Sequence, residues 1–215
     1  MLKNYFQKVG LRRILIMLFG NFFLGLGIAI FKLSGLGNDP FSGMVMALSN
    51  VTGIVYANFL ILFNLCIFII QLLAGREMIG AGTIVNACLL GYFVTFWYNV
   101  ITSFADGPDG LIQRILLVCI GVVVNGFGVS MYQTSDVGVA PFDSLSLIMV
   151  KKWPKIPYFW HRIVTDAIAA FVCFAAGGII GLGTLVSVFG LGPFVHFFNV
   201  HFSEKMVERK NSSIE

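Results

Sequence analysis

Charged side chains are scarce in this sequence. Asp, Glu, Lys and Arg make up only 11% of its 215 residues, whereas 58% are hydrophobic and the mean hydropathy is +0.90. Soluble domains carry about 25% charged residues, so the composition excludes a soluble globular protein. No charged side chain occurs between Arg13 and Lys32, and a helix of that length covers most of a ~30 Å hydrocarbon core. We therefore predict an all-α fold, a polytopic bundle of membrane helices.

Motifs that carry chemistry are also missing. The four cysteines stand singly in apolar runs without a CxxC pair, and the three histidines share no spacing typical of a metal site. There is no GxSxG, HExxH or phosphate-binding loop. We therefore expect no enzyme activity, no cofactor and no metal site. The net charge of +4 follows from the orientation of membrane loops and does not indicate nucleic acid.

One glycine- and proline-containing stretch is present twice. Residues 34–42 (SGLGNDPFS) return 101 positions later as residues 135–143 (SDVGVAPFD). A gapless alignment at this offset also matches Arg13 with Arg114 and residues 79–83 (IGAGT) with 180–184 (IGLGT). About a quarter of positions 13–96 are identical in the two copies, which indicates an internal duplication. We expect membrane repeats at 13–104 and 114–202, a loop at 105–113 and tails at 1–12 and 203–215.

Each repeat contains four apolar elements, and the second is short. The elements are 13–33, 40–52, 55–74 and 79–104, then 114–134, 141–151, 157–176 and 180–202. The segment from Pro141 to Val150 makes only about 15 Å of helix, half a bilayer. Proline suits the first turn of a helix, so Pro40 and Pro141 should begin half-helices. The irregular backbone before each must face protein or a water-filled cavity.

The distribution of basic residues leaves two topologies open. With both termini cytoplasmic and eight crossings, twelve of the fourteen basic residues lie inside, leaving Lys32 and Arg76 outside. Re-entrant half-helices would give six crossings and an inverted repeat, merely exchanging Arg114 for Arg76. We favour the parallel eight-crossing arrangement, because it keeps Arg13 and Arg114 at the cytoplasmic end of their helices. The basic N-terminus lacks a signal-peptide cleavage pattern, and its apolar run returns after Arg114, so we interpret that run as a retained helix.

The repeated turns are the predicted binding site, because broken helices at matching positions of two halves mark transporter sites; a purely structural hairpin is the alternative. Free N–H groups and the helix dipole there would favour an anion or a polar head group. Asp39 and Asp143 could instead cap their own helices. Asp39 aligns with Ala140, and Asp143 with Ser42, so a shared site would be asymmetric.

Two further polar side chains lie inside the apolar runs. Asp166 is costly within a membrane unless paired or facing a cavity, and Arg162 one turn earlier offers an ion pair. Asn64 occupies nearly the equivalent place in the first repeat, and such intramembrane amides usually bond neighbouring helices. The candidate substrate- or ion-binding residues are Gly37, Asp39, Pro40, Phe41, Asn64, Gly138, Pro141, Phe142, Asp143 and Asp166.

The motifs GLG-x-x-PF at 35–41 and VGVAPFD at 137–143, following a glycine-rich first helix, resemble the YczE/YyaS/YitT group of bacterial membrane proteins. The resemblance covers about residues 10–202 and is closest to the YczE branch. It implies a multi-pass protein of the bacterial plasma membrane. It implies no substrate and no binding residue.

Two functions from different classes fit these features. The first is a small secondary transporter, or permease, of an unidentified solute, with H⁺ handled by Asp39, Asp143 or Asp166. The second is a membrane-embedded accessory protein that stabilises or assembles a partner without moving solute. Broken helices and intramembrane acids favour transport. A chain this small could form a homodimer, although no residue indicates the interface.

Overall fold

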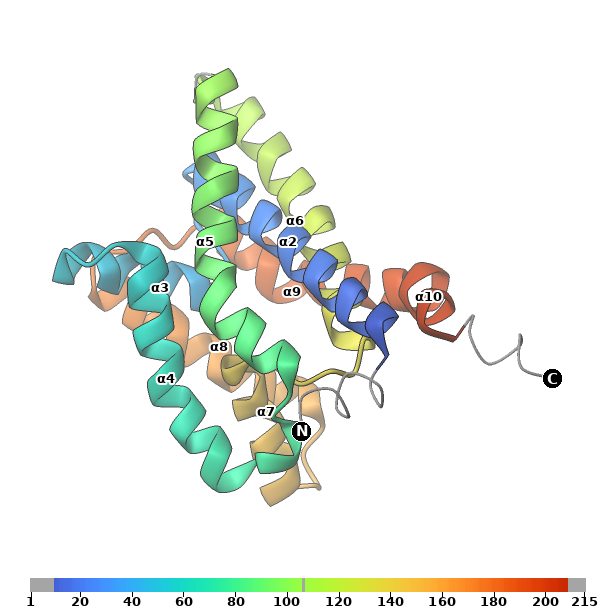
Figure 1. Ribbon diagram of the computed structural model, residues 1–215. Coiled ribbons are helices and arrows are strands. Elements are labelled where there is room, and N and C mark those ends of the chain that lie inside the picture. Colours follow the sequence, from blue (N-terminus) through green and yellow to red (C-terminus); the bar gives the residue numbers. More distant parts are fainter. Residues whose placement is uncertain (1–9, 106, 209–215) are drawn as a thin grey trace.

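The computed structural model describes residues 10–105 and 107–208, and within them the chain is helical, without a strand (Figure 1). The expected tails at 1–12 and 203–215 lie largely outside the described residues. The helices are α2 (Leu11–Ser34), α3 (Pro40–Thr52), α4 (Tyr56–Ala74), α5 (Ala81–Phe104), α6 (Leu111–Thr134), α7 (Pro141–Lys152), α8 (Tyr158–Ala175), α9 (Leu182–Phe198) and α10 (Glu204–Glu208). Short η1 (Arg76–Met78) and η2 (Asn199–Ser203) segments precede α5 and α10.

The expected helix boundaries are confirmed to within a few residues, including both short elements. Pro40 and Pro141 occupy the first turns of α3 and α7. Helix α2 ends at Gly35, whose φ of 65° is left-handed, and α3 ends at Gly53 in the same conformation. Glycine adopts the left-handed conformation at low cost, so each of these glycines can close the last turn of a helix.

Five helices are long and apolar enough to cross a membrane: α2, α4, α5, α6 and the segment from Leu182 to Val207. Helix α4 shows how they are arranged. It buries Asn64 and Gln71, whereas Leu65 and Leu73 are 57% and 82% exposed. Polar groups therefore face the protein and apolar ones face outward, which is the arrangement expected in contact with lipid.

Helices α2 and α6 cross in contact and run in opposite directions (Figure 1). A Cβ added to Gly20 would lie 2.5 Å from the Tyr132 backbone nitrogen, and one added to Gly27 would lie 2.7 Å from that of Asn125. Arg13 at the start of α2 lies 3.9 Å from Asp136, just after the end of α6. Such close crossing needs small residues at the contact.

The parallel arrangement favoured from the sequence was therefore wrong. It requires α2 and α6 to run in the same direction, with Arg13 and Arg114 at the same end. Instead, Arg114 lies beside Gly35, at the opposite end of α2 from Arg13. The charge count could not distinguish the two topologies, and the glycine-rich surfaces that allow the antiparallel crossing decide between them.

The broken segments before α3 and α7 each contact the start of a helix in the other half. Gly82 of α5 donates its backbone N–H to the Val137 carbonyl at 2.8 Å. Gly183 of α9 donates to the Leu36 carbonyl at 2.8 Å. The donors, like the acceptors, are 101 positions apart. Both broken segments also contain a left-handed glycine, Gly37 at φ 97° and Gly138 at φ 116°.

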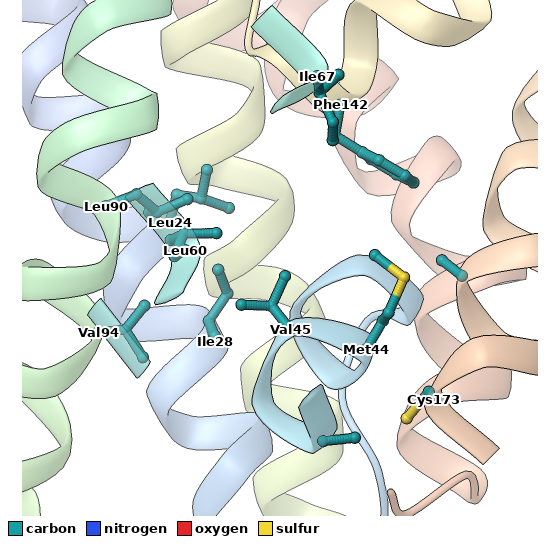
Figure 2. Close-up of a cluster of buried hydrophobic side chains, with 12 residues drawn as sticks. Leu24, Ile28, Met44, Val45, Leu60, Ile67, Leu90, Val94, Phe142 and Cys173 are labelled. Atoms are coloured by element: carbon teal, nitrogen blue, oxygen red, sulfur yellow. The ribbon is translucent and has the colours of Figure 1, made fainter. Parts of the chain in front are cut away.

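The half-helices α3 and α7 each pack against both α4 and α8. The main apolar core forms around α3, whose Val45 lies beside Ile28 of α2 while Met44 faces the side of Cys173 in α8 (Figure 2). Leu60 and Leu90 extend this core to α4 and α5. Packing on both faces holds the N-termini of the two half-helices in fixed positions at the centre of the molecule.

Candidate functional site

The first turns of α3 and α7 meet. The rings of Phe41 and Phe142, each following the helix-starting proline, stack with centroids 4.3 Å apart and planes 18° from parallel. This stack borders a cavity of about 700 Å³, within the size range of small-molecule sites. Six of the ten candidate residues line the cavity: Asp39, Pro40, Phe41, Phe142, Asp143 and Asp166. Gly37, Asn64, Gly138 and Pro141 are not part of its lining.

Asp39 caps helix α3 with one carboxylate oxygen. Its Oδ1 accepts a hydrogen bond from the Ser42 backbone N–H at 3.0 Å. Asn38 holds the Asp39 backbone, with Asn38 Oδ1 accepting from the Asp39 N–H at 2.8 Å. The second oxygen, Oδ2, is buried and has no hydrogen-bond partner. Capping is therefore confirmed, and it leaves half of the carboxylate free for another partner.

Asp143 does not cap α7. The capping position is Ala140, whose backbone N–H donates to the Tyr132 hydroxyl at 2.9 Å. That hydroxyl in turn donates to Asp143 Oδ2 at 2.9 Å. The other oxygen, Oδ1, accepts from the Arg162 guanidinium. Capping was the wrong expectation here: α7 has no side-chain cap, Tyr132 accepts only from the N–H of Ala140, and Asp143 binds Arg162 instead.

Asp166 forms the ion pair expected from its spacing. Arg162 Nε donates to Asp166 Oδ2 at 3.1 Å, one helical turn apart on α8. Asp166 is only 6% exposed, and its Oδ1 is buried without a partner. Arg162 also lies over the Phe142 ring, with its guanidinium carbon 5.4 Å from the centroid. The pair and a place in the cavity are thus compatible rather than alternatives.

The charges of the cavity lining are unbalanced. Three carboxyl groups, one guanidinium and the imidazole of His196 line it, together with the uncharged polar groups of Asn86, Asn125, Gln133, Asn199 and others. Each half-helix start also carries an acid in its first turn or at its cap. The positive end of each helix dipole is therefore already compensated, and the geometry does not favour the anion suggested by the sequence.

The other candidate groups have structural surroundings. Gly37 and Gly138 pack against the starts of α9 and α5, where an added Cβ would lie 2.5 Å from Thr184 Oγ1 and 2.6 Å from the Gly80 backbone, respectively. Asn64 is buried with both side-chain polar atoms unpartnered. The expected amide bonding between helices occurs elsewhere, where Asn86 Nδ2 donates to Asn21 Oδ1 at 2.9 Å.

Sequence reasoning missed two members of the site. Arg162 was recognised only as the partner of Asp166, although it also binds Asp143 from another helix. Tyr132 was not singled out, yet the repeat offset aligns it with Phe31, so a hydroxyl present in only one copy was a usable signal. In the described part of the chain, no three His, Cys, Asp or Glu side chains are placed to hold a metal ion.

The chain belongs to a family described as a family of unknown function, DUF6198, which it matches over residues 11–200. An uncharacterized protein of Haemophilus influenzae is 28% identical over 87% of this chain and 83% of its own length. From Bacillus subtilis, the uncharacterized protein YyaS is 26% identical over 83% of this chain and 88% of its own length. The uncharacterized membrane protein YczE, also from Bacillus subtilis, is 26% identical over 82% of each chain. No solved structure matches. The resemblance inferred from the Pro-Phe motifs is thus confirmed.

Proposed function

We propose that this membrane protein is a secondary transporter whose solute site is the cavity where α3 and α7 meet. One observation carries the proposal: two interrupted helices bring buried, partly unpaired charges to a solute-sized cavity among membrane-length helices. Intramembrane ionisable groups are retained mainly where they bind or move ions and solutes. The proposal involves no covalent chemistry.

The two halves of this transporter are inverted repeats. Their alignment at an offset of 101 supports this, as do the paired contacts that exchange the two halves, Gly82 with Val137 and Gly183 with Leu36. The antiparallel crossing of α2 and α6 supports the inverted rather than the parallel form. Inverted repeats with broken helices are the usual architecture of transporters that alternate access to a central site.

Asp39 and Asp166 are the proposed coupling groups. Each keeps one buried oxygen without a partner, so each can accept a proton or a cation when the solute enters or leaves. Asp143 is fully engaged with Tyr132 and Arg162 and holds the site together. This division makes Asp166→Asn the variant that separates transport from stability.

The test is solute-driven ion movement in proteoliposomes. The purified protein is reconstituted with a pH-sensitive dye inside, and a panel of amines, amino acids, sugars and carboxylates is added outside. A solute that changes internal pH with wild type and with Asp109→Asn, but not with Asp166→Asn, supports transport. Asp109 is an exposed matched acid outside the cavity.

The accessory role makes a different prediction. If no member of the panel moves protons or produces a current, while Asp166→Asn changes only the melting temperature, transport is contradicted. Capture of one partner that purifies with wild type and stabilises it would then favour the accessory role.

A further inference from the structure

The charge of the cavity points to the class of solute. Asp39, Asp143 and Asp166 line it against one permanent cation, Arg162. With all four ionised and the lining imidazole of His196 neutral, the lining carries two uncompensated negative charges. Buried unpaired charges are unstable unless protons or a counter-ion neutralise them.

Two of the three carboxylates each have one oxygen without a partner, and these are the places where a positive charge is needed. Both oxygens of Asp143 are bonded, one to Tyr132 and one to Arg162. Asp39 Oδ2 and Asp166 Oδ1 have no partner, and Asp166 is more than nine-tenths buried. A carboxylate oxygen accepts hydrogen bonds only, so each unpaired oxygen needs a donor. A ligand with N–H donors and a positive charge meets both requirements.

The remaining walls suit an organic ion rather than a bare one. The cavity of about 700 Å³ is far larger than a dehydrated metal ion, and no metal-ligand cluster occurs among the described residues. Its lining includes aromatic side chains at Phe41, Phe142, Tyr158 and Phe159. Aromatic faces attract cations and also bury apolar groups.

We propose that the cavity binds a small monovalent organic cation, a protonated amine or related ammonium with an apolar group. The ammonium lies between Asp39 and Asp166, and the apolar group lies against the Phe41–Phe142 stack. This assignment rests on the proposed function for its biological meaning, although the binding can be measured without transport.

The experiment compares two probes of similar shape and opposite charge. Purified protein is heated with 2-phenylethylammonium or with 3-phenylpropanoate, and its melting temperature is followed. We expect a rise of about 5 °C with the cation near saturation and no rise with the anion. Asp39→Asn and Asp166→Asn should each reduce the cation's shift at least by half, whereas Asp109→Asn should keep it.

Three outcomes would overturn the assignment: an equal shift with the anion, a cation shift that survives in both cavity variants, or no shift with either probe. The comparison of the two probes on wild type does not depend on any variant folding. Failure of the proposed function looks different. A cation shift abolished by Asp166→Asn, without any flux in proteoliposomes, would keep the cation site and contradict transport.

A second inference rests on a different observation, the unequal packing of two helix pairs. Helices α4 and α5 pack closely against each other. A Cβ on Gly91 would lie 2.7 Å from Ala57 Cα, and Tyr92 donates a hydrogen bond to Asn58 at 3.1 Å. At the matching position between α8 and α9, nothing lies within 4 Å of a Cβ built on Gly192.

The cavity follows the same inequality. Helices α8 and α9 both line it, for example with Phe159 and Pro193, whereas no residue of α4 does. Among the described residues, α8 and α9 barely touch each other, whereas α4 and α5 pack together. The cavity therefore extends between the separated pair, whereas from the packed pair only α5 reaches it, with Asn86 and Leu90.

We infer that this structure is one of two exchangeable states. In the other state α8 closes on α9 at Gly192, and α4 separates from α5 at Gly91. Exchanging the conformations of the two inverted halves relates these states by a pseudo-two-fold axis in the membrane plane, so access moves from one side of the site to the other, as alternating access requires.

Cysteine cross-linking in native membranes tests the exchange. One double variant carries Asn58→Cys and Tyr92→Cys across the packed pair, and its matched counterpart carries Phe159→Cys and Pro193→Cys across the separated pair. The background removes the native thiols: Cys66→Ala, Cys88→Ala, Cys119→Ala and Cys173→Ala. Single-cysteine variants control for links between molecules.

We expect the 58–92 link to form at once and the 159–193 link to form slowly, as the second state is visited. In a variant that carries all four introduced cysteines, at positions 58, 92, 159 and 193, formation of one link should prevent formation of the other within the same molecule. Formation of both links in the same molecule, or failure of the 159–193 link to form at all, would overturn the inference. Exclusive links without solute flux would keep the two states and contradict transport alone.

Discussion

The half-helices α3 and α7 meet at the Phe41–Phe142 stack. They begin with the same two residues, but different contacts stabilise their first turns. Both half-helices start with Pro-Phe. In the first half, Asp39 caps its own helix and keeps a free oxygen. In the second half no side chain caps the helix, Tyr132 accepts from the Ala140 N–H, and Asp143 binds Arg162. The first half is thus satisfied locally, and the second depends on side chains from α6 and α8. Of the four Asp and Arg side chains that line the cavity, three lie in the second half of the chain and one in the first.

The same contrast separates α4 from α8. At the repeat offset, Arg162 and Asp166 of α8 match Ile61 and Leu65 of α4. Helix α4 packs against α5, while α8 stays apart from α9 and lines the cavity. The helix with the charges is the one that faces the cavity, because an ion pair needs polar surroundings that apolar packing cannot provide.

The largest effect should come from removing the charge on which the second half depends. Arg162→Ala leaves Asp143 and Asp166 without their shared cation. Breaking a fully buried pair costs about 3–5 kcal/mol, and we expect the lower end of that range because 28% of the Arg162 side chain is exposed. We expect a large loss of melting temperature in detergent, against little change for the exposed Arg76→Ala. Adding Asp143→Asn and Asp166→Asn to Arg162→Ala should recover part of the loss. No recovery would show that Arg162 acts through packing rather than charge.

The next largest effect concerns the two glycines between helix pairs. Gly91→Leu inserts a side chain where Ala57 already lies, and overpacking costs about 1–3 kcal/mol. Gly192→Leu enters open space and should leave the melting temperature within error. Thermal unfolding of the two purified variants, followed by circular dichroism, gives the two melting temperatures to be compared. Equal destabilisation by both variants would contradict the unequal packing described here.

A smaller effect is expected at the hydroxyl that only the second half has. Tyr132→Phe removes the donor to Asp143 and the acceptor for the Ala140 N–H, leaving buried groups unpaired at about 1–2 kcal/mol. The reverse change at the matching position, Phe31→Tyr, buries a new hydroxyl without restoring these bonds. Chemical denaturation of the two single variants and the double variant measures this. Full compensation in the double variant would show that the two positions are interchangeable.

The smallest effect should come from the surface pair between η1 and α7. Lys151 donates to Glu77 at 2.7 Å, and this hydrogen bond lowers the pKa of Glu77. A lowered folded-state pKa stabilises the protein above the pKa of the unfolded state, and the gain is lost as pH falls through the folded-state value. Both groups are exposed, so Glu77→Gln should change the melting temperature within experimental error at pH 7. A clear loss of melting temperature would show that the Lys151–Glu77 pair contributes more to stability than an exposed pair does.

Much of the fold could be predicted from the sequence, because helix signals are local. Pro40, Pro141 and the apolar runs placed each helix closely, and the offset of 101 brought the two Pro-Phe turns together as one candidate site. The direction of α6 relative to α2 could not be predicted, because both topologies have the same charge count. It depends on how glycine-lined surfaces fit in three dimensions. The Arg162–Asp143 pair could not be predicted either. The two residues are nineteen positions apart and lie on different helices, and no local signal gives the relative placement of those helices.

The crossed bonds of Gly82 with Val137 and Gly183 with Leu36 have a consequence for biosynthesis. Helix α5 leaves the ribosome before its partner segment at 137 has been made. The 34–39 segment is made even longer before its own partner, α9. The first half must therefore stay in the bilayer with its corner unclosed until the second half is inserted, and only the last long helix completes the interlock. A chain cut between α5 and α6 should assemble only when both fragments are produced in the same membrane, and neither fragment alone should survive proteolysis.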